Sequence, residues 1–97
     1  MSQDNTTNRV KFTVGRVRGF ECPQDKSEAK LWDSDVKALI LRARQTGSKA
    51  YYFQDRLNGK LLRIKIGDVS ENGISLQDAR KLALEYQKLV RTGRDPR

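Results

Sequence analysis

The dipeptide Asn58-Gly59 stands between two stretches of alternating apolar and polar residues, and it constrains the fold more than any other feature of the chain. A two-residue hairpin turn of type I′ needs positive φ at both central residues, which Asn and Gly adopt most readily. The sequence therefore predicts an antiparallel hairpin with strands over residues 49–57 and 60–66. A third strand, over residues 39–45, is predicted to precede the hairpin.

Alternation along the three strands predicts one apolar and one basic face. Successive side chains of a strand point to opposite faces, so a slip of one residue would turn the arginines into the core. Leu41, Phe53 and Ile64 fall on the apolar face, together with Asp55, which we expect at the margin of the sheet. The basic face carries Arg42, Arg44, Tyr52, Gln54, Arg56, Arg63 and Lys65, with no acidic residue among them. Such a face suits a polyanion, and a ribbon of two or three strands suits a DNA groove.

A long amphipathic helix is predicted over residues 75–92. Ser75 can cap its first turn, and Asp78 stands where a capping box has its acidic member. Gly93 follows as a natural stop. Apolar residues recur at spacings of three and four and form one stripe, which consists of Leu76, Ala79, Leu82, Ala83, Tyr86, Leu89 and Val90. We expect this stripe to pack against the apolar face of the sheet.

The N-terminal segment gives weaker signals. Residues 1–10 are predicted to be a disordered tail because they are mostly polar. Thr13 can cap a short helix in which Val14 and Val17 point inward, and a short strand is the alternative for this segment.

Residues 29–33 add a short strand, in which we expect Trp32 to be mostly buried. Together these elements predict an α+β fold, in which a three-stranded antiparallel sheet packs on one long C-terminal helix, with a short N-terminal helix or strand. We expect the domain to span residues 11–93, and residues 94–97 to begin a linker to a central domain absent from this chain.

The charge of the chain favours a polyanionic partner. Its 20 Lys and Arg residues outnumber its 12 Asp and Glu residues, which gives a net charge of +8. That excess indicates nucleic acid or an anionic membrane surface. No apolar run approaches the ~20 residues of a membrane span, and the start lacks the apolar region of a signal peptide. We therefore expect an intracellular protein with no membrane partner.

The residue types leave little room for catalysis or metal binding. The chain has no His and a single Cys, Cys22, so an internal disulfide, a zinc site and a Ser-His or Cys-His catalytic pair are all excluded. The carboxylates of Asp25, Glu28, Asp33 and Asp35 are expected to be solvated loop residues or turn formers. We predict no catalytic residue, no metal site and no cofactor in this chain.

Short motifs follow one another along the chain in a recognisable order. They are Leu31-Trp32-Asp33, Leu39 with Leu41-Arg42, Gly47-Ser48-Lys49, Arg56-Leu57-Asn58-Gly59-Lys60, Arg63-Ile64-Lys65-Ile66-Gly67, Ile74-Ser75-Leu76 with Ala79-Arg80, and Gly93-Arg94-Asp95-Pro96-Arg97. This series resembles the N-terminal arm-type DNA-binding domain of prophage tyrosine recombinases, the phage integrase family, over residues 11–97. The chain departs from the family at Lys37-Ala38 and Ile40, where the family often has Pro-Gly and a small residue.

The resemblance implies a sheet, backed by a helix, that enters the major groove of arm-type attachment sites on double-stranded DNA. It also implies that the catalytic residues of the recombinase lie in a later domain. The protein would then work in the cytoplasm of a bacterial host, on the nucleoid. Other recombinase subunits and accessory DNA-bending proteins are the further partners that the resemblance implies.

The predicted function is sequence-specific binding of double-stranded DNA for prophage integration and excision. The groove residues would be Arg42, Arg44, Tyr52, Gln54, Arg56, Arg63 and Lys65, while Lys49 and Lys60 would meet phosphates. Two alternatives stay open. A double-stranded RNA-binding module has a similar order of elements, but here Asp78 stands in the first turn of the final helix, where a lysine cluster would be expected. A protein-interaction module of a recombinase assembly would use the sheet face or its edge.

Overall fold

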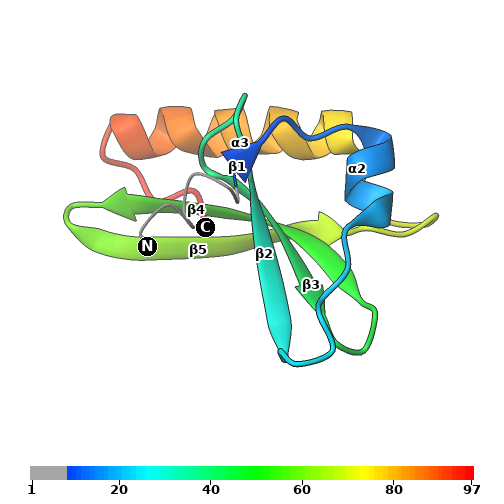
Figure 1. Cartoon of the computed structure of the whole chain (residues 1–97). Helices are drawn as coiled ribbons and strands as arrows, with labels where there is room; N and C mark the ends of the chain where they lie inside the picture. The colour runs from blue at the N-terminus through cyan, green and yellow to red at the C-terminus, as the bar shows by residue number, and fades with distance from the viewer. Residues whose placement is uncertain (1–8) are drawn as a thin grey trace.

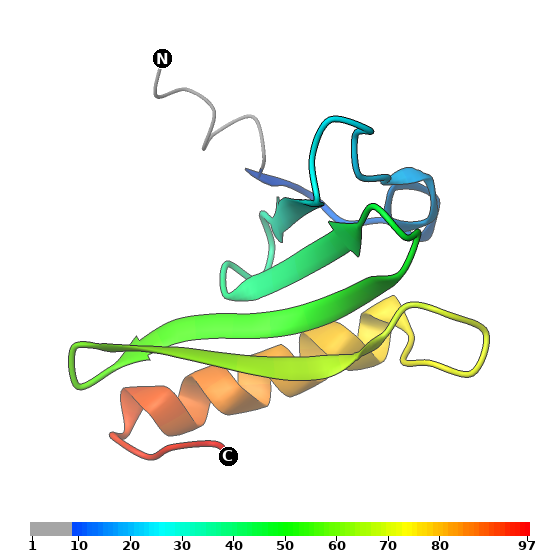
Figure 2. The same cartoon turned by 90° about the horizontal axis from the view of Figure 1, so that it is seen from below.

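Residues 9–97 form one mixed sheet with two helices, as described by a computed structural model of the chain (Figure 1). The strands are β1 (Arg9–Val10), β2 (Glu28–Asp33), β3 (Leu39–Arg44), β4 (Lys49–Leu57) and β5 (Lys60–Asp68), and the helices are α2 (Val14–Gly19) and α3 (Leu76–Arg91). The strands lie side by side in the order β1-β2-β3-β4-β5, with β1 parallel to β2 and all other neighbours antiparallel. Helix α3 lies along one face of the sheet, beneath β4 and β5 in the view of Figure 2.

The hairpin predicted from Asn58-Gly59 is confirmed. Both turn residues have positive φ, at 53° and 82°. In the resulting register Phe53 lies opposite Ile64 on the side of α3, so the predicted phase of the strands is also confirmed. The pairing shifts by one residue beside Tyr51, a β-bulge that increases the local twist of the ribbon.

The apolar stripe of α3 packs on the sheet as predicted. Ala79 and Ala83 are completely buried, and their small side chains let the helix come close to the strands. The completely buried Phe53 ring meets Tyr86 edge to face, with the ring centroids 5.5 Å apart. The buried core consists of Phe12, Val17, Leu31, Val36, Ala38, Leu39, Leu41, Tyr51, Phe53, Leu62, Ala79 and Ala83.

The structure confirms the predicted N-terminal cap of helix α2 and the burial of one of its two valines. The Thr13 hydroxyl accepts a hydrogen bond of 3.1 Å from the backbone N–H of Arg16, which confirms the predicted cap. Val17 is buried, but Val14 is 57% exposed, so the inward placement of Val14 is wrong. A helix of six residues offers only one side to the core, and Val17 occupies it.

The sheet has five strands, and the predicted count of three is wrong. The strand expected over residues 29–33 is present as β2 and pairs with β3 in the same sheet. The fifth strand, β1, consists of Arg9 and Val10, which the prediction assigned to the tail. Two residues are too few to show a pattern of alternation in the sequence. The remainder of the predicted tail, residues 1–8, lies outside the described residues.

A buried carboxylate, that of Asp33, joins elements that are distant in the sequence. Asp33 is completely buried and accepts hydrogen bonds from the backbone N–H groups of Phe12, Asp35 and Val36 at 3.1, 3.3 and 3.2 Å. The Arg80 guanidinium of α3 donates to the same carboxylate at 3.0 Å and to the carbonyl oxygen of Phe12 at 2.8 Å. The prediction that Asp33 is solvated is therefore wrong. Its charged partner stands 47 residues away along the chain, and no local pattern indicates it.

The ionised form of Asp33 stabilises the fold because of the groups that surround it. Burial alone would raise the pKa of Asp33, but hydrogen bonds from Arg80 and from the backbone N–H groups of Phe12 and Asp35 outweigh burial and lower that pKa. A carboxylate of this kind contributes stability that is complete above its unfolded pKa of about 4. That contribution is lost as the pH falls through the lower pKa of the folded state.

Asp33→Asn is expected to lower the free energy of unfolding near neutral pH by about 3 kcal/mol, because it leaves the Arg80 charge without its buried partner. The difference from the wild type should shrink as the pH falls from about 5 toward about 2. Urea unfolding followed by circular dichroism measures both effects. A difference that is absent at neutral pH, or that stays constant into acid, would contradict an ionised anchor at this position.

Candidate nucleic-acid interface

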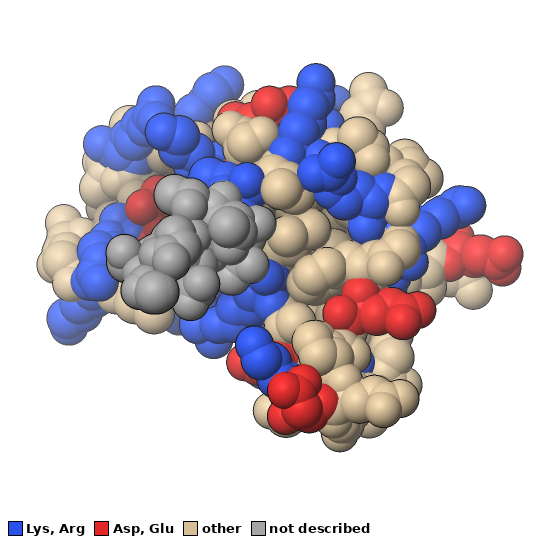
Figure 3. Space-filling view, viewed as in Figure 1, with Lys and Arg blue, Asp and Glu red and all other residues tan. Residues whose placement is uncertain are grey.

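The face of the sheet turned away from α3 carries most of the residues predicted to bind DNA. We call it the outer face. From the strand register, its members are Glu28, Lys30, Trp32, Ile40, Arg42, Arg44, Ala50, Tyr52, Gln54, Arg56, Leu61, Arg63, Lys65 and Asp68. The structure thus brings all the predicted groove residues to one side of the sheet. Figure 3, which has the viewpoint of Figure 1 with α3 along the top, shows Lys and Arg side chains in several groups around the visible surface and acidic side chains in smaller groups.

An apolar row crosses the middle of the outer face, where Trp32, Ile40 and Tyr52 pair across β2, β3 and β4. Ile40 is only 2% exposed, although α3 lies on the opposite side of the sheet. The Arg9 guanidinium lies 5.3 Å from the Trp32 ring, and the Arg42 guanidinium lies 5.7 Å from the Tyr52 ring. These cation–π contacts hold arginines flat against the sheet. Trp32 is half-buried under Arg9, so the expectation of a mostly buried Trp32 holds only in part.

Two acids lie on the outer face beside the predicted residues, none of which is itself acidic. Glu28 of β2 forms an ion pair with Arg42, and Asp68 at the end of β5 lies 2.9 Å from the Lys65 ammonium group. The hydrogen bond from Arg42 lowers the pKa of Glu28, and the same bond raises the pKa of Arg42. Both acids lie outside the three strands that were predicted, and Glu28 is a strand residue instead of a solvated loop residue.

Three arginines of the outer face, Arg44, Arg56 and Arg63, form no ion pair with an acidic side chain within residues 9–97. Arg63 donates from Nε to Oε1 of Gln54 at 2.9 Å, directly across the β4–β5 ladder. Arg56 donates to the carbonyl oxygen of Gly59 at 3.4 Å, which ties it loosely to the turn.

The end of the β4–β5 hairpin projects beyond the rest of the sheet. Strand β3 pairs with β4 as far as Leu39 opposite Phe53, and one further backbone bond runs from the Gln54 N–H to the Ala38 carbonyl oxygen at 2.9 Å. Residues 54–63 beyond this point form a two-stranded ribbon, with Gln54 and Arg63 at its base. We call this segment the distal ribbon. Figure 2 shows its tip extending past β2 and β3. Five strands at spacings of about 4.8 Å are about 19 Å across, whereas the major groove is about 12 Å wide and admits a two-stranded ribbon. The full sheet is therefore too wide for a groove, whereas the distal ribbon fits one.

Lys49, which was predicted to meet phosphate, points to the inner side of the sheet. Its ammonium group donates to the carbonyl oxygens of Val17 and Arg18 at 2.9 and 2.7 Å, at the C-terminal end of α2. A cation at this position satisfies carbonyl groups that the helix leaves unpaired. Lys60, the other predicted phosphate contact, is exposed at the hairpin turn.

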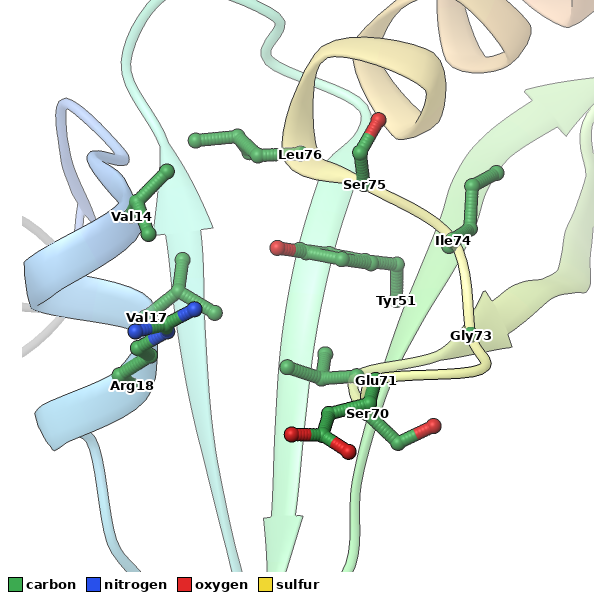
Figure 4. A pocket seen from close by; sticks show the side chains of 11 residues that line it. Val14, Val17, Arg18, Tyr51, Ser70, Glu71, Gly73, Ile74, Ser75 and Leu76 are labelled. Carbon is green, nitrogen blue, oxygen red and sulfur yellow. The ribbon is translucent and has the colours of Figure 1, made fainter.

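A cavity of about 460 Å³ lies on the inner side, between α2 and the loop that leads into α3. Val14, Val17 and Leu76 contribute apolar walls, and the Tyr51 hydroxyl points into the cavity (Figure 4). Among its lining residues, Arg18 is the single basic one and Glu71 the single acidic one. This balance does not suit a polyanion, so the outer face is the stronger candidate for nucleic acid.

Residues 9–97 show neither a metal site nor a membrane-spanning helix. In this part of the chain no group of three or more Cys, Asp or Glu side chains is arranged to hold a metal ion. Nor does this part contain a helix that is long and apolar enough to cross a membrane. The Cys22 thiol is half-buried and lies 3.2 Å from the carbonyl oxygen of Lys26.

The fold and the outer face define a class of protein, a small domain that presents a basic sheet surface backed by a helix. The model of the family described as "Arm DNA-binding domain" matches residues 6–97. The chain belongs to this family of DNA-binding domains. The resemblance to the arm-type domains of phage integrases, predicted from the sequence, is confirmed by this match and by the first relative below.

The chain is similar to parts of two longer proteins. It is 43% identical over 96 residues to a protein named prophage integrase IntF from Escherichia coli strain K12, in an alignment that covers 99% of this chain and 20% of that protein. It is 36% identical over 76 residues to a protein named histidinol-phosphate aminotransferase from Francisella philomiragia, which covers 66% of this chain and 20% of that protein. The chain spans about a fifth of the length of both relatives. The family assignment does not rest on the second of them.

Lys49→Met is expected to lower the free energy of unfolding by about 1 kcal/mol, because α2 loses the cation at its C-terminal carbonyl groups. DNA affinity should stay nearly unchanged, since the ammonium group lies on the inner side. Lys65→Met is the matched control, which removes the same charge from the exposed outer face and should weaken DNA binding with little loss of stability. Thermal unfolding and fluorescence anisotropy with a labelled duplex measure the two effects. If both variants weaken binding equally at unchanged stability, Lys49 contacts phosphate after all.

Proposed function

We propose that the chain recognises specific sites on double-stranded DNA, as the arm-site-binding part of a tyrosine recombinase that integrates and excises a prophage. The observation that carries this proposal is the distal ribbon. It is narrow enough for the major groove and presents Gln54, Arg56 and Arg63 on its outer side. Membership of the Arm DNA-binding domain family and likeness to a prophage integrase support the choice of DNA.

In this proposal one end of the outer face contacts the bases, and the other end binds the phosphates. Arg56 and Arg63 reach base edges from the distal ribbon, and Gln54 lies beside Arg63 on the same face. Arg44 lies six residues from Gln54, counted along the β3–β4 ladder, which is about 20 Å at about 3.3 Å per residue. At that point the ribbon has widened into the full sheet. It therefore meets the phosphate backbone beside the groove, as do Lys65 on the same face and Lys60 at the turn.

Arg42 and Tyr52 have a different part in the same surface. Arg42 is half-buried, paired with Glu28 and stacked over Tyr52. Its side chain therefore lies against the sheet and stabilises the outer face. The Tyr52 ring lies between the two ends of the outer face. The edge of this ring contacts the sugar-phosphate backbone or a thymine methyl group.

The parent protein is longer, in keeping with relatives of which this chain covers 20%. We propose that its catalytic residues lie outside this chain, and that other recombinase subunits and accessory DNA-bending proteins assemble with it on the attachment site. Its place would be the cytoplasm of a bacterial host. A domain of this size binds weakly alone, and linked domains raise the overall affinity.

Arg63→Ala is expected to weaken binding to an attachment-site duplex by about tenfold, because it removes a contact to a base edge. Lys81→Ala, which removes one positive charge from the exposed side of α3, is the matched control and should have little effect. Neither variant should change the melting temperature, since both side chains are exposed. Fluorescence anisotropy at several salt concentrations measures the affinity.

The same titrations test the nature of the contact. The logarithm of the binding constant should fall with the logarithm of salt concentration, with a slope of about −0.9 for each neutralised phosphate. Arg44→Ala should reduce that slope by about one unit, while Arg63→Ala should change it less. Equal binding of duplex RNA, or equal effects of Arg63→Ala and Lys81→Ala, would refute DNA recognition through the distal ribbon. A-form RNA has a deep, narrow major groove that this ribbon does not fit.

A further inference from the structure

The Gln54–Arg63 pair has an arrangement of hydrogen-bonding groups that goes beyond a generally basic surface. The two residues lie directly opposite each other on β4 and β5, at the base of the distal ribbon. Arg63 donates from Nε to Oε1 of Gln54 at 2.9 Å. This bond fixes the plane of the guanidinium group and uses one of the two lone pairs of the Gln54 amide oxygen.

The bond leaves the pair with donors for an outside ligand. The N–H groups on both terminal nitrogens of Arg63 have no partner within residues 9–97. The amide nitrogen of Gln54 likewise keeps its N–H groups, because only the oxygen of that side chain is engaged. No carboxylate competes for these donors: Asp55 turns to the other side of the strand, where its Oδ1 accepts from the backbone N–H of Arg56.

A surface that offers mainly donors discriminates between the base pairs of the major groove. Guanine presents two adjacent acceptors, N7 and O6. Adenine presents N7 beside an N–H donor, cytosine presents a donor, and thymine presents one acceptor beside a methyl group. A free glutamine would suit adenine, because its oxygen accepts from N6 while its nitrogen donates to N7. In this pair the Arg63 donors lie beside that oxygen and would face the N6 donor of adenine, so adenine is disfavoured.

We propose that Gln54 and Arg63 act as one unit that reads a guanine in the major groove, with Arg63 donating to O6 and N7 and Gln54 holding the guanidinium in place. This inference rests on the proposed function and adds the base that one position of the site must contain. Arg63 contacts the base directly. Gln54 is a positioning residue whose loss frees the arginine to turn to a phosphate.

Selection from a random duplex library with the full chain tests the pair even where the target sequence is unknown. The wild type should enrich a sequence with guanine at one position. Gln54→Ala and Arg63→Lys should each lose the preference at that position, by about tenfold, while keeping the preferences at the others. Arg63→Lys keeps the charge but lacks the planar fork, and Lys81→Ala serves as the control with an unchanged pattern.

Replacing the enriched guanine by 7-deazaguanine removes the N7 acceptor and should weaken wild-type binding by about tenfold, with a smaller effect on Arg63→Lys. A guanine preference that survives in both variants, or an adenine in its place, would overturn the inference while leaving DNA recognition intact. A wild-type chain that enriches no sequence would instead overturn the proposed function itself. Thermal unfolding of each variant shows that a lost preference does not reflect a lost fold.

Discussion

The ion pair between Asp33 and Arg80 is the interaction on which the arrangement of this domain depends. A buried carboxylate is tolerated only when its oxygens are hydrogen-bonded and its charge is matched. Asp33 meets that condition through three backbone N–H groups and one guanidinium group from α3. The pair therefore fixes α3 on one side of the sheet and holds the segment before α2 against β2. The opposite face is left for a ligand.

That uncovered face is stabilised by the same residue types that give it charge. Ile40 is almost completely buried in a place where no helix covers it, beside Trp32 and Tyr52. Arg9 and Arg42 lie over these two rings, and their long apolar stems shield the surface from water. The basic residues thus divide into two groups. Those in the middle cover the sheet, and those on the distal ribbon, Arg56 and Arg63, are available to a partner.

Sequence reasoning succeeded where the signal lies within a few residues. The turn at Asn58-Gly59, the Thr13 cap and the apolar stripe of α3 follow from local preferences, and alternation placed each groove residue on the correct side of its strand. It failed where two distant segments determine the outcome. Two residues of β1 carry no readable pattern, and neither the burial of Asp33 nor the binding of Lys49 to the end of α2 can be read without the partners, which stand 47 and 32 residues away. Alternation also could not show which of the charged residues pair with each other.

The central claim is that DNA contacts the outer face of the distal ribbon, not the helical side of the domain. Titration of the ¹⁵N-labelled chain with a short attachment-site duplex, followed by amide shifts in NMR spectra, tests it most directly. The largest changes should fall on residues 54–63 and extend to Arg44, while α3 stays unperturbed. Changes centred on α2 and the loop at residues 70–76, around the apolar cavity, would contradict the claim and place the nucleic acid on the other side of the sheet.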